Sequence, residues 1–244
     1  MDLGQAAVLA AAGLLAGFLN TLAGGGSVIT LPVLEWSTGL PGVANATNRI
    51  GLLFQNLMAV GTFHAGGKVP VRLGLRLSVP ALIGGVAGAW LATVLPVEAM
   101  RTALAAAVVF VAVVTILNNP TTPRMKSPWI EIAFLAIGVY MGFLQAGAGF
   151  ALLAVLVGGL GLDLVRANAA KVLIVLITTI FALLVFGLRG QIRLLHGLVL
   201  AVGMMGGARI GARMAIEKGA AWVRVVVVVA AIGAVTKLLV FPSG

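Results

Sequence analysis

Residues 17–48 read GFLNTLAGGGSVITLPVLEWSTGLPGVANATN, and this stretch decides how the chain folds. An apolar run from Ala6 to Ala23 stops at three consecutive glycines followed by Ser27. Consecutive glycines remove side chains and permit non-helical backbone angles. Backbone groups freed by such a break cannot face hydrocarbon, so the break must face protein or a water-filled cavity. The stretch therefore predicts an interrupted helix in a membrane protein, with the break turned inward.

The composition of the whole chain supports a membrane environment. The 244 residues are 61% hydrophobic and only 9% charged, and the mean hydropathy is +1.17. A soluble domain carries about 25% charged residues, and one of this size could not bury so much apolar surface. A transmembrane helix takes roughly 20 apolar residues, so the chain has room for about eight. Because no Lys or Arg precedes the first apolar run, we interpret this run as a retained transmembrane helix rather than a signal peptide.

The apolar runs and their breaks predict an all-α membrane protein of about eight transmembrane helices in two homologous four-helix halves with glycine-rich helix breaks. The predicted organisation is a first repeat at 1–117, a linker at 118–128 and a second repeat at 129–244. Helices are expected at 5–23, 43–63, 73–95, 98–117, 129–148, 165–187, 194–216 and 220–240, with short apolar segments at 28–36 and 150–160 after the two breaks.

The two halves also match in sequence. Ala44-Asn45-Ala46 matches Ala167-Asn168-Ala169, and Gly24 matches Gly149. Four helices per half would make the repeats parallel, whereas five would make them inverted if each short segment crosses separately. Basic residues fall near both membrane faces on this map, and we favour a cytoplasmic location for both ends of the chain.

A polar stripe follows the first break. At about 100° per residue, the polar residues of the helix at 43–63 share one face, and their equivalents recur in the helix at 165–187. Such a face should turn away from lipid, either to bond neighbouring helices or to bind a ligand. Arg49 and Lys171 are ionised and have few acids nearby, so we expect them to recognise an anion.

Together, the breaks and the stripes predict a substrate cavity between the halves, near the middle of the membrane. A helix that restarts after a break aims its N–H groups and positive dipole end at the break, which suits an anion. The alternative is that each break is a packing hinge. The expected substrate-binding residues are Asn20, Gly24, Gly25, Gly26, Ser27, Asn45, Asn48, Arg49, Gln55, Gln145, Gly147, Gly149, Asn168, Lys171 and Thr178.

Other classes of function lack their motifs. The chain has no cysteine, which excludes disulfides and thiolate sites, and it contains no phosphate-binding loop or H-E-x-x-H motif. We therefore expect no catalytic residues, metal or cofactor, and no enzyme activity. The net charge of +10 fits basic membrane loops better than a nucleic-acid partner. Arg209 and Arg213 lie one turn apart, and two interpretations stay open: interfacial snorkelling or an anion funnel.

The stretch 17–48 resembles the signature of the TauE/SafE sulfite-exporter family, and the likeness extends over the whole chain. It rests on Gly24 to Gly26, Pro32 and Ala44-Asn45-Ala46-Thr47, with a weaker echo at Gly147-Ala148-Gly149-Phe150. The resemblance implies a multi-pass carrier in the bacterial inner membrane for sulfite or an organosulfonate such as sulfoacetate. The expected partners are a small anionic substrate and the lipid bilayer, with a coupling ion (proton or sodium) and a homodimer left open. A passive anion channel and a carboxylate transporter on the same scaffold are the alternatives.

Overall fold

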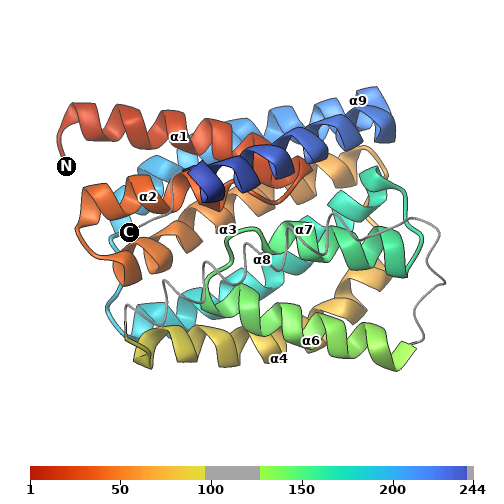
Figure 1. The fold of residues 1–244 in the computed structure, drawn as a ribbon, viewed down its shortest axis with the longest axis horizontal. Coiled ribbons are helices and arrows are strands. Elements are labelled where there is room, and N and C mark those ends of the chain that lie inside the picture. The colour runs from red at the N-terminus through yellow and green to blue at the C-terminus, as the bar shows by residue number, and fades with distance from the viewer. Residues whose placement is uncertain (97–126, 241–244) are drawn as a thin grey trace.

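The computed structural model of the chain describes residues 1–96 and 127–240, and all regular structure within these ranges is helical (Figure 1). The elements are α1 Leu3–Leu22, α2 Ser27–Thr38, α3 Pro41–Ala65, α4 Val71–Val94, α6 Ser127–Phe143, α7 Ala148–Leu153, the π-helical turn η1 Ala154–Gly159, α8 Leu164–Leu188 and α9 Leu194–Val240. The predicted helix at 98–117 and most of the predicted linker lie outside the described residues. For the described residues, the all-α prediction is confirmed.

Among the described residues, four helices are long and apolar enough to cross a membrane: α1, α4, α8 and α9, whose apolar stretch Leu194–Ala230 includes a break at Gly219. The 25-residue α3 is long enough but carries the polar stripe, and α6 and the α7–η1 segment are shorter apolar helices. These features are those of a multi-pass helical membrane protein.

Several helix ends follow directly from local sequence. Gly39 ends α2 with a left-handed φ of 77°, and Pro41 begins α3, where its missing N–H is not needed. The Asp163 side chain accepts the N–H groups of Val165 and Arg166 and so caps the start of α8.

Within α9, two helices meet at Gly219, whose φ of 76° and ψ of −173° are not helical. In Figure 1 the blue ribbon of α9 turns back on itself, so its two segments run in opposite directions. This break lies between the helices predicted at 194–216 and 220–240.

The helices form a layer in which α1 and α9 occupy one edge, α4 and α6 the other, and α3 and α8 lie between (Figure 1). Glycine pairs bring the edge helices into backbone contact. A side chain added at Gly203 would strike Ala10, one at Gly207 would strike Leu14, and these contacts advance together along α1 and α9. The first parts of α9 and α1 are therefore parallel.

The opposite edge is built in the same way. A side chain at Gly138 would strike Ala81, and one at Gly142 would strike Gly85, so α6 is parallel to α4. By the same reasoning, α9 is parallel to α3, and α8 is parallel to α4. Because a short connection joins α3 to α4, as Figure 1 shows, these two are antiparallel. Thus α1, α3 and the first part of α9 run one way, and α4, α6 and α8 run the other.

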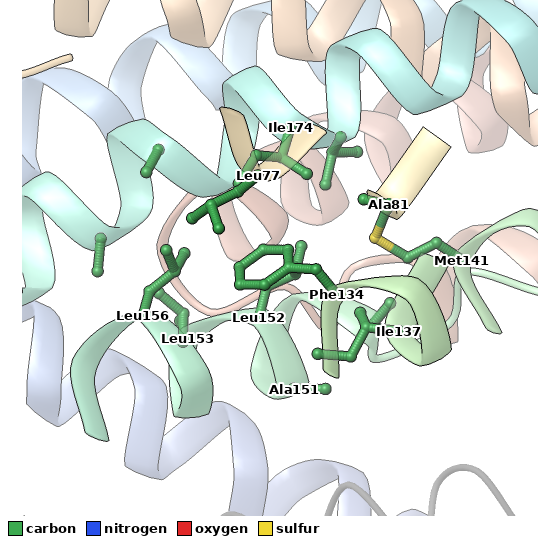
Figure 2. Packing of buried hydrophobic residues seen from close by; sticks show 14 of the residues in the cluster. Leu77, Ala81, Phe134, Ile137, Met141, Ala151, Leu152, Leu153, Leu156 and Ile174 are labelled. Carbon is green, nitrogen blue, oxygen red and sulfur yellow. The ribbon is translucent and has the colours of Figure 1, made fainter. Parts of the chain in front are cut away.

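The main apolar core lies where α4, α6, the α7–η1 segment and α8 meet. Figure 2 shows the ring of Phe134 between Leu77 and Ile174 on one side and Leu152 and Leu153 on the other. Phe134 and Leu152 are fully buried. This packing holds the helices on both sides of the second helix break.

We expect Gly207→Ala to lower the stability of the bundle by about 1–3 kcal/mol, the usual cost of overpacking a tight interior. Its new Cβ would collide with the backbone carbonyl of Leu14. The neighbouring Gly206→Ala is the matched control, because its Cβ would meet only the flexible Leu14 Cδ1, at 3.2 Å. The measurement is the thermal unfolding midpoint of each purified variant in detergent. Equal midpoints for the two variants would contradict the backbone contact between α1 and α9.

Candidate functional site

The two helix breaks meet at the centre of the molecule. A Cβ added at Gly24 would overlap the Cα of Gly149, and one added at Gly149 would overlap the Cα of Gly24. Left-handed backbone occurs at both breaks, with φ of 95° at Gly24, 63° at Gln145 and 75° at Gly147. Gln145 is the only non-glycine with positive φ among the described residues, and strain of this kind gathers at functional sites. Two segments 125 residues apart in sequence thus form one central structure.

A small cavity, which we call the central cavity, lies against this contact. Its free volume is about 20 Å³, enough for about one water molecule. The lining comes from α1, both breaks, α3 and α8. The lining residues are Asn20, Gly24, Ser27, Leu52, Gln55, Asn56, Gln145, Ala148, Gly149, Lys171 and Val175.

Lys171 carries the positive charge of the central cavity. Its side chain is 2% exposed, and its Nζ donates to the carbonyl oxygens of Asn20 at 2.9 Å and Thr21 at 3.1 Å and to Asn168 Oδ1 at 2.6 Å. An ammonium has three N–H donors, so these acceptors match its full donor set. Among the residues that line the cavity there is no carboxylate to balance the charge.

Arg49 is buried nearby but does not line the central cavity. Its Nη1 donates to the Met141 carbonyl at 2.6 Å and to Gln145 Oε1, and its Nη2 donates to the Gly142 carbonyl at 2.8 Å. The guanidinium carbon lies 5.5 Å from the centroid of the Phe186 ring, within cation–π range. Among the described residues, the only ion pair joins two other residues, Arg76 and Glu131.

Lys171 and Arg49 play equivalent roles in the two halves of the chain, because each binds the end of a helix from the other half. The last carbonyl groups of a helix lack intrahelical partners and form its negative end. Lys171 of α8 binds the carbonyl groups at the end of α1, whereas Arg49 of α3 binds those at the end of α6. Helix ends therefore provide the negative partner that stabilises each buried cation. Each half of the chain thus holds the interrupted helix of the other half.

Amide side chains organise the first break. Asn20 Oδ1 accepts the Gly26 N–H at 2.8 Å, and Asn20 Nδ2 donates to Gln55 Oε1 at 3.2 Å. Asn48 Nδ2 donates to Ser27 Oγ at 3.3 Å. Ser27 and Gly149 line the cavity, and their backbone N–H groups find no acceptor among the described residues. They are therefore available as hydrogen-bond donors to a ligand.

Comparisons with known proteins identify the family of this chain. The sequence profile of the family described as sulfite exporter TauE/SafE matches residues 9–238. The chain belongs to the TauE/SafE family. It is 29% identical over 233 residues to "Probable membrane transporter protein YfcA" of Escherichia coli K12, covering 93% of this chain and 86% of that protein. It is 27% identical over 248 residues to "Probable membrane transporter protein ORF9" of Sinorhizobium sp., covering 97% and 93%. No solved structure matches.

This TauE/SafE chain therefore belongs to a family of membrane transporters rather than to an enzyme family. A "Probable membrane transporter protein" of Haemophilus influenzae is 26% identical over 237 residues, covering 94% of this chain and 93% of that protein. The names of these relatives do not specify a substrate.

The structure brings only part of the predicted site of this TauE/SafE protein to the cavity wall. The predicted residues that line the cavity are Asn20, Gly24, Ser27, Gln55, Gln145, Gly149 and Lys171. Those that do not are Gly25, Gly26, Asn45, Asn48, Arg49, Gly147, Asn168 and Thr178.

Most of this second group supports the breaks instead. Asn45 Nδ2 donates to the Phe143 carbonyl at the end of α6, and Asn168 accepts from Lys171. Thr178 differs, because its hydroxyl bonds carbonyl groups of its own helix. Asn45 and Asn168 therefore help to hold the backbone of the site without facing the cavity.

Four lining residues were outside the predicted set: Leu52, Asn56, Ala148 and Val175. Asn56 lies on the polar stripe of α3, one residue beyond Gln55, and that pattern could have found it. Ala148 lies between Gly147 and Gly149 in the second break, so that motif could have found it. Leu52 and Val175 are apolar, and nothing in their sequence context separates them from ordinary core residues.

Proposed function

We propose that the chain is a secondary transporter that moves a small anion through the central cavity, and that the anion is sulfite or an organosulfonate such as sulfoacetate. The main support for an anionic substrate is Lys171, a buried cation on the cavity wall with no carboxylate among the other lining residues. A site of this kind attracts anions, because an anionic ligand completes the charge balance. The free N–H groups of Ser27 and Gly149 add donors suited to sulfonate or sulfite oxygens.

The size of the cavity favours a carrier over an open channel. Its free volume of about 20 Å³ holds about one water molecule, and sulfite is larger than water. The helices must therefore separate to admit the anion. A cavity that opens only by helix movement suits alternating access.

The helix directions support an inverted repeat of two halves, one at 1–117 and one at 129–244. The corresponding helices α1 and α6 run in opposite directions, and so do α3 and α8, which follows from the glycine contacts together with the short connection between α3 and α4. The first helix of each half also packs against a helix of the other half: α1 packs on α9, and α6 packs on α4. Inverted repeats place their substrate site at the interface between the halves, where the central cavity lies.

The proposed function is tested by transport in liposomes that contain only this chain. Sulfite and sulfoacetate are supplied on one side, with a proton or a sodium gradient imposed in separate experiments, and small dicarboxylates serve as comparison. Saturable anion flux that a gradient drives uphill is expected. Flux that rises linearly with concentration would indicate a passive channel, and saturable flux of dicarboxylates alone would replace the sulfur-containing substrate.

We also infer which end of the bundle faces the cytoplasm. The end where α3 finishes and α4 and α8 begin collects most of the described basic residues at helix ends: Lys68, Arg72, Arg76, Arg166, Arg213, Lys218 and Arg224. The other end has Arg189, Arg193 and Lys237. The positive-inside rule assigns the more basic end to the cytoplasm. The sequence favoured a cytoplasmic location for both ends of the chain, and this orientation reverses it, because α1 runs parallel to α3 and therefore begins at the less basic end.

Single cysteines can test this orientation, since the natural chain has none. We expect a membrane-impermeant thiol reagent to label Ser37→Cys, at the less basic end, in intact cells. Labelling of Ala65→Cys, at the more basic end, should need permeabilised cells. Both positions are at least partly exposed. The reverse pattern of labelling would overturn the orientation.

A further inference from the structure

A second and much larger hollow lies away from the central cavity, between α3 and α9. We call it the outer groove. Its volume is about 690 Å³, and it is open to the surroundings. Its lining residues are Phe54, Leu57, Met58, Gly61, Thr62, Ala65, Gly66, Met205, Arg209, Arg213, Ile216 and Glu217. None of these residues lines the central cavity, so the outer groove is a separate feature.

The outer groove has the length of one leaflet. It follows α3 from Phe54, beside the midpoint of that helix, to Gly66 just beyond its end. These 12 residues of helical rise span about 18 Å. One half of the hydrocarbon core of a bilayer is about 15 Å thick. A groove that runs from the membrane surface to its middle matches a lipid acyl chain in direction and length.

The charged residues of the groove follow α9 from Arg209, one turn beyond Met205, to Glu217 at the surface end. Arg209 and Arg213 are exposed, stand one turn apart on α9, and form no ion pair with any described acid. Glu217 lies one turn beyond Arg213 on the same wall, so the two arginines leave this wall with a net positive charge. The deeper part of the groove is apolar, with Phe54, Leu57 and Met205 on its walls.

We propose that the outer groove binds an anionic phospholipid, with an acyl chain along α3 and the phosphate at Arg209 and Arg213. Basic pockets between transmembrane helices bind lipid headgroups, and each arginine near the surface favours an anionic lipid. A second copy of this chain would not explain why an apolar groove of leaflet length has two cations on one wall. The proposal is independent of the transported substrate.

The test is native mass spectrometry of the purified full chain with phosphatidylglycerol or phosphatidylcholine of identical acyl chains. The wild-type chain should bind phosphatidylglycerol about tenfold more tightly than phosphatidylcholine. The double variant Arg209→Gln with Arg213→Gln should lose this preference. Arg72→Gln is the matched control, since Arg72 is an exposed arginine at the same end of the bundle but outside the groove. It should keep the preference.

A second variant tests the apolar part of the groove. Gly61 lines the groove, and a side chain added there meets nothing within 4 Å. Gly61→Phe should therefore fold and fill the groove, and binding of both lipids should fall together. Equal binding of the two lipids by the wild-type chain would overturn the proposal. So would a wild-type dimer that Gly61→Phe dissociates, because the groove would then be an interface between copies.

Discussion

Replacing Lys171 by methionine is expected to weaken anion binding at the central cavity severely and to reduce transport with it. Methionine keeps much of the length of the side chain and removes its charge. Truncating one partner of a buried charged interaction costs about 2 kcal/mol or more, which corresponds to about a 30-fold loss of affinity. The measurements are saturable flux in liposomes and the rise in thermal stability that sulfite produces in the purified protein.

The Lys171→Met variant has a second effect that must be separated from the first. It leaves the Asn20 and Thr21 carbonyl groups without their cation, and a buried acceptor without a partner costs about 1–3 kcal/mol. Arg49→Met is the matched control. It removes the corresponding cation from the end of α6, but Arg49 does not line the cavity. Both variants should be less stable, and only Lys171→Met should lose the stabilisation by sulfite.

Lys171→Arg completes the comparison, since it keeps the positive charge and adds bulk. Partial recovery of anion-dependent stabilisation in Lys171→Arg would agree with recognition by charge. If Lys171→Met and Arg49→Met respond equally to sulfite, Lys171 has only the structural role of holding α1, and the anion site must lie elsewhere.

Local features of this chain are readable from its sequence. The glycines at 24–26 and 147–149 predict interruptions, and the structure has left-handed backbone at Gly24 and Gly147. The polar stripe of the helix at 43–63 predicts an inward face, and Asn45, Asn48, Arg49 and Gln55 are all buried. Both depend on short-range rules: glycine alone tolerates such angles cheaply, and ionised side chains avoid lipid.

The sequence does not predict in the same way which helices pack against each other, or in which direction they run. The hydropathy of a span is the same in both directions, so sequence left parallel and inverted halves open. Arg49 illustrates a second limit. A buried cation without acids has the sequence pattern of an anion site, yet its partners are backbone carbonyl groups more than 90 residues away. Backbone acceptors leave no residue-type signal, so the structural role of Arg49 could not be separated from a binding role.

The contact between the two breaks leads to the second large effect: Gly24→Ala should prevent the central cavity from forming. Gly24 meets two requirements at once, because its φ is 95° and its α-carbon lies against Gly149. A left-handed angle costs an L-residue roughly 1–2 kcal/mol. Forcing a methyl group into a packed backbone contact adds about 1–3 kcal/mol.

The adjacent glycine provides a matched control. Gly25 has no positive φ, and a Cβ there would meet only the Phe150 ring, at 2.9 Å, which can rotate aside. Gly24→Ala should lower the unfolding midpoint sharply and abolish saturable flux, whereas Gly25→Ala should retain most of both. In the second break, two different glycines meet the two requirements that Gly24 meets alone: Gly147 has the positive φ, and Gly149 makes the backbone contact. Gly149→Ala should therefore suffer only the overpacking cost and fall between the other two variants. If all three variants unfold at the same temperature, the two breaks do not press against each other, and the cavity cannot depend on their contact.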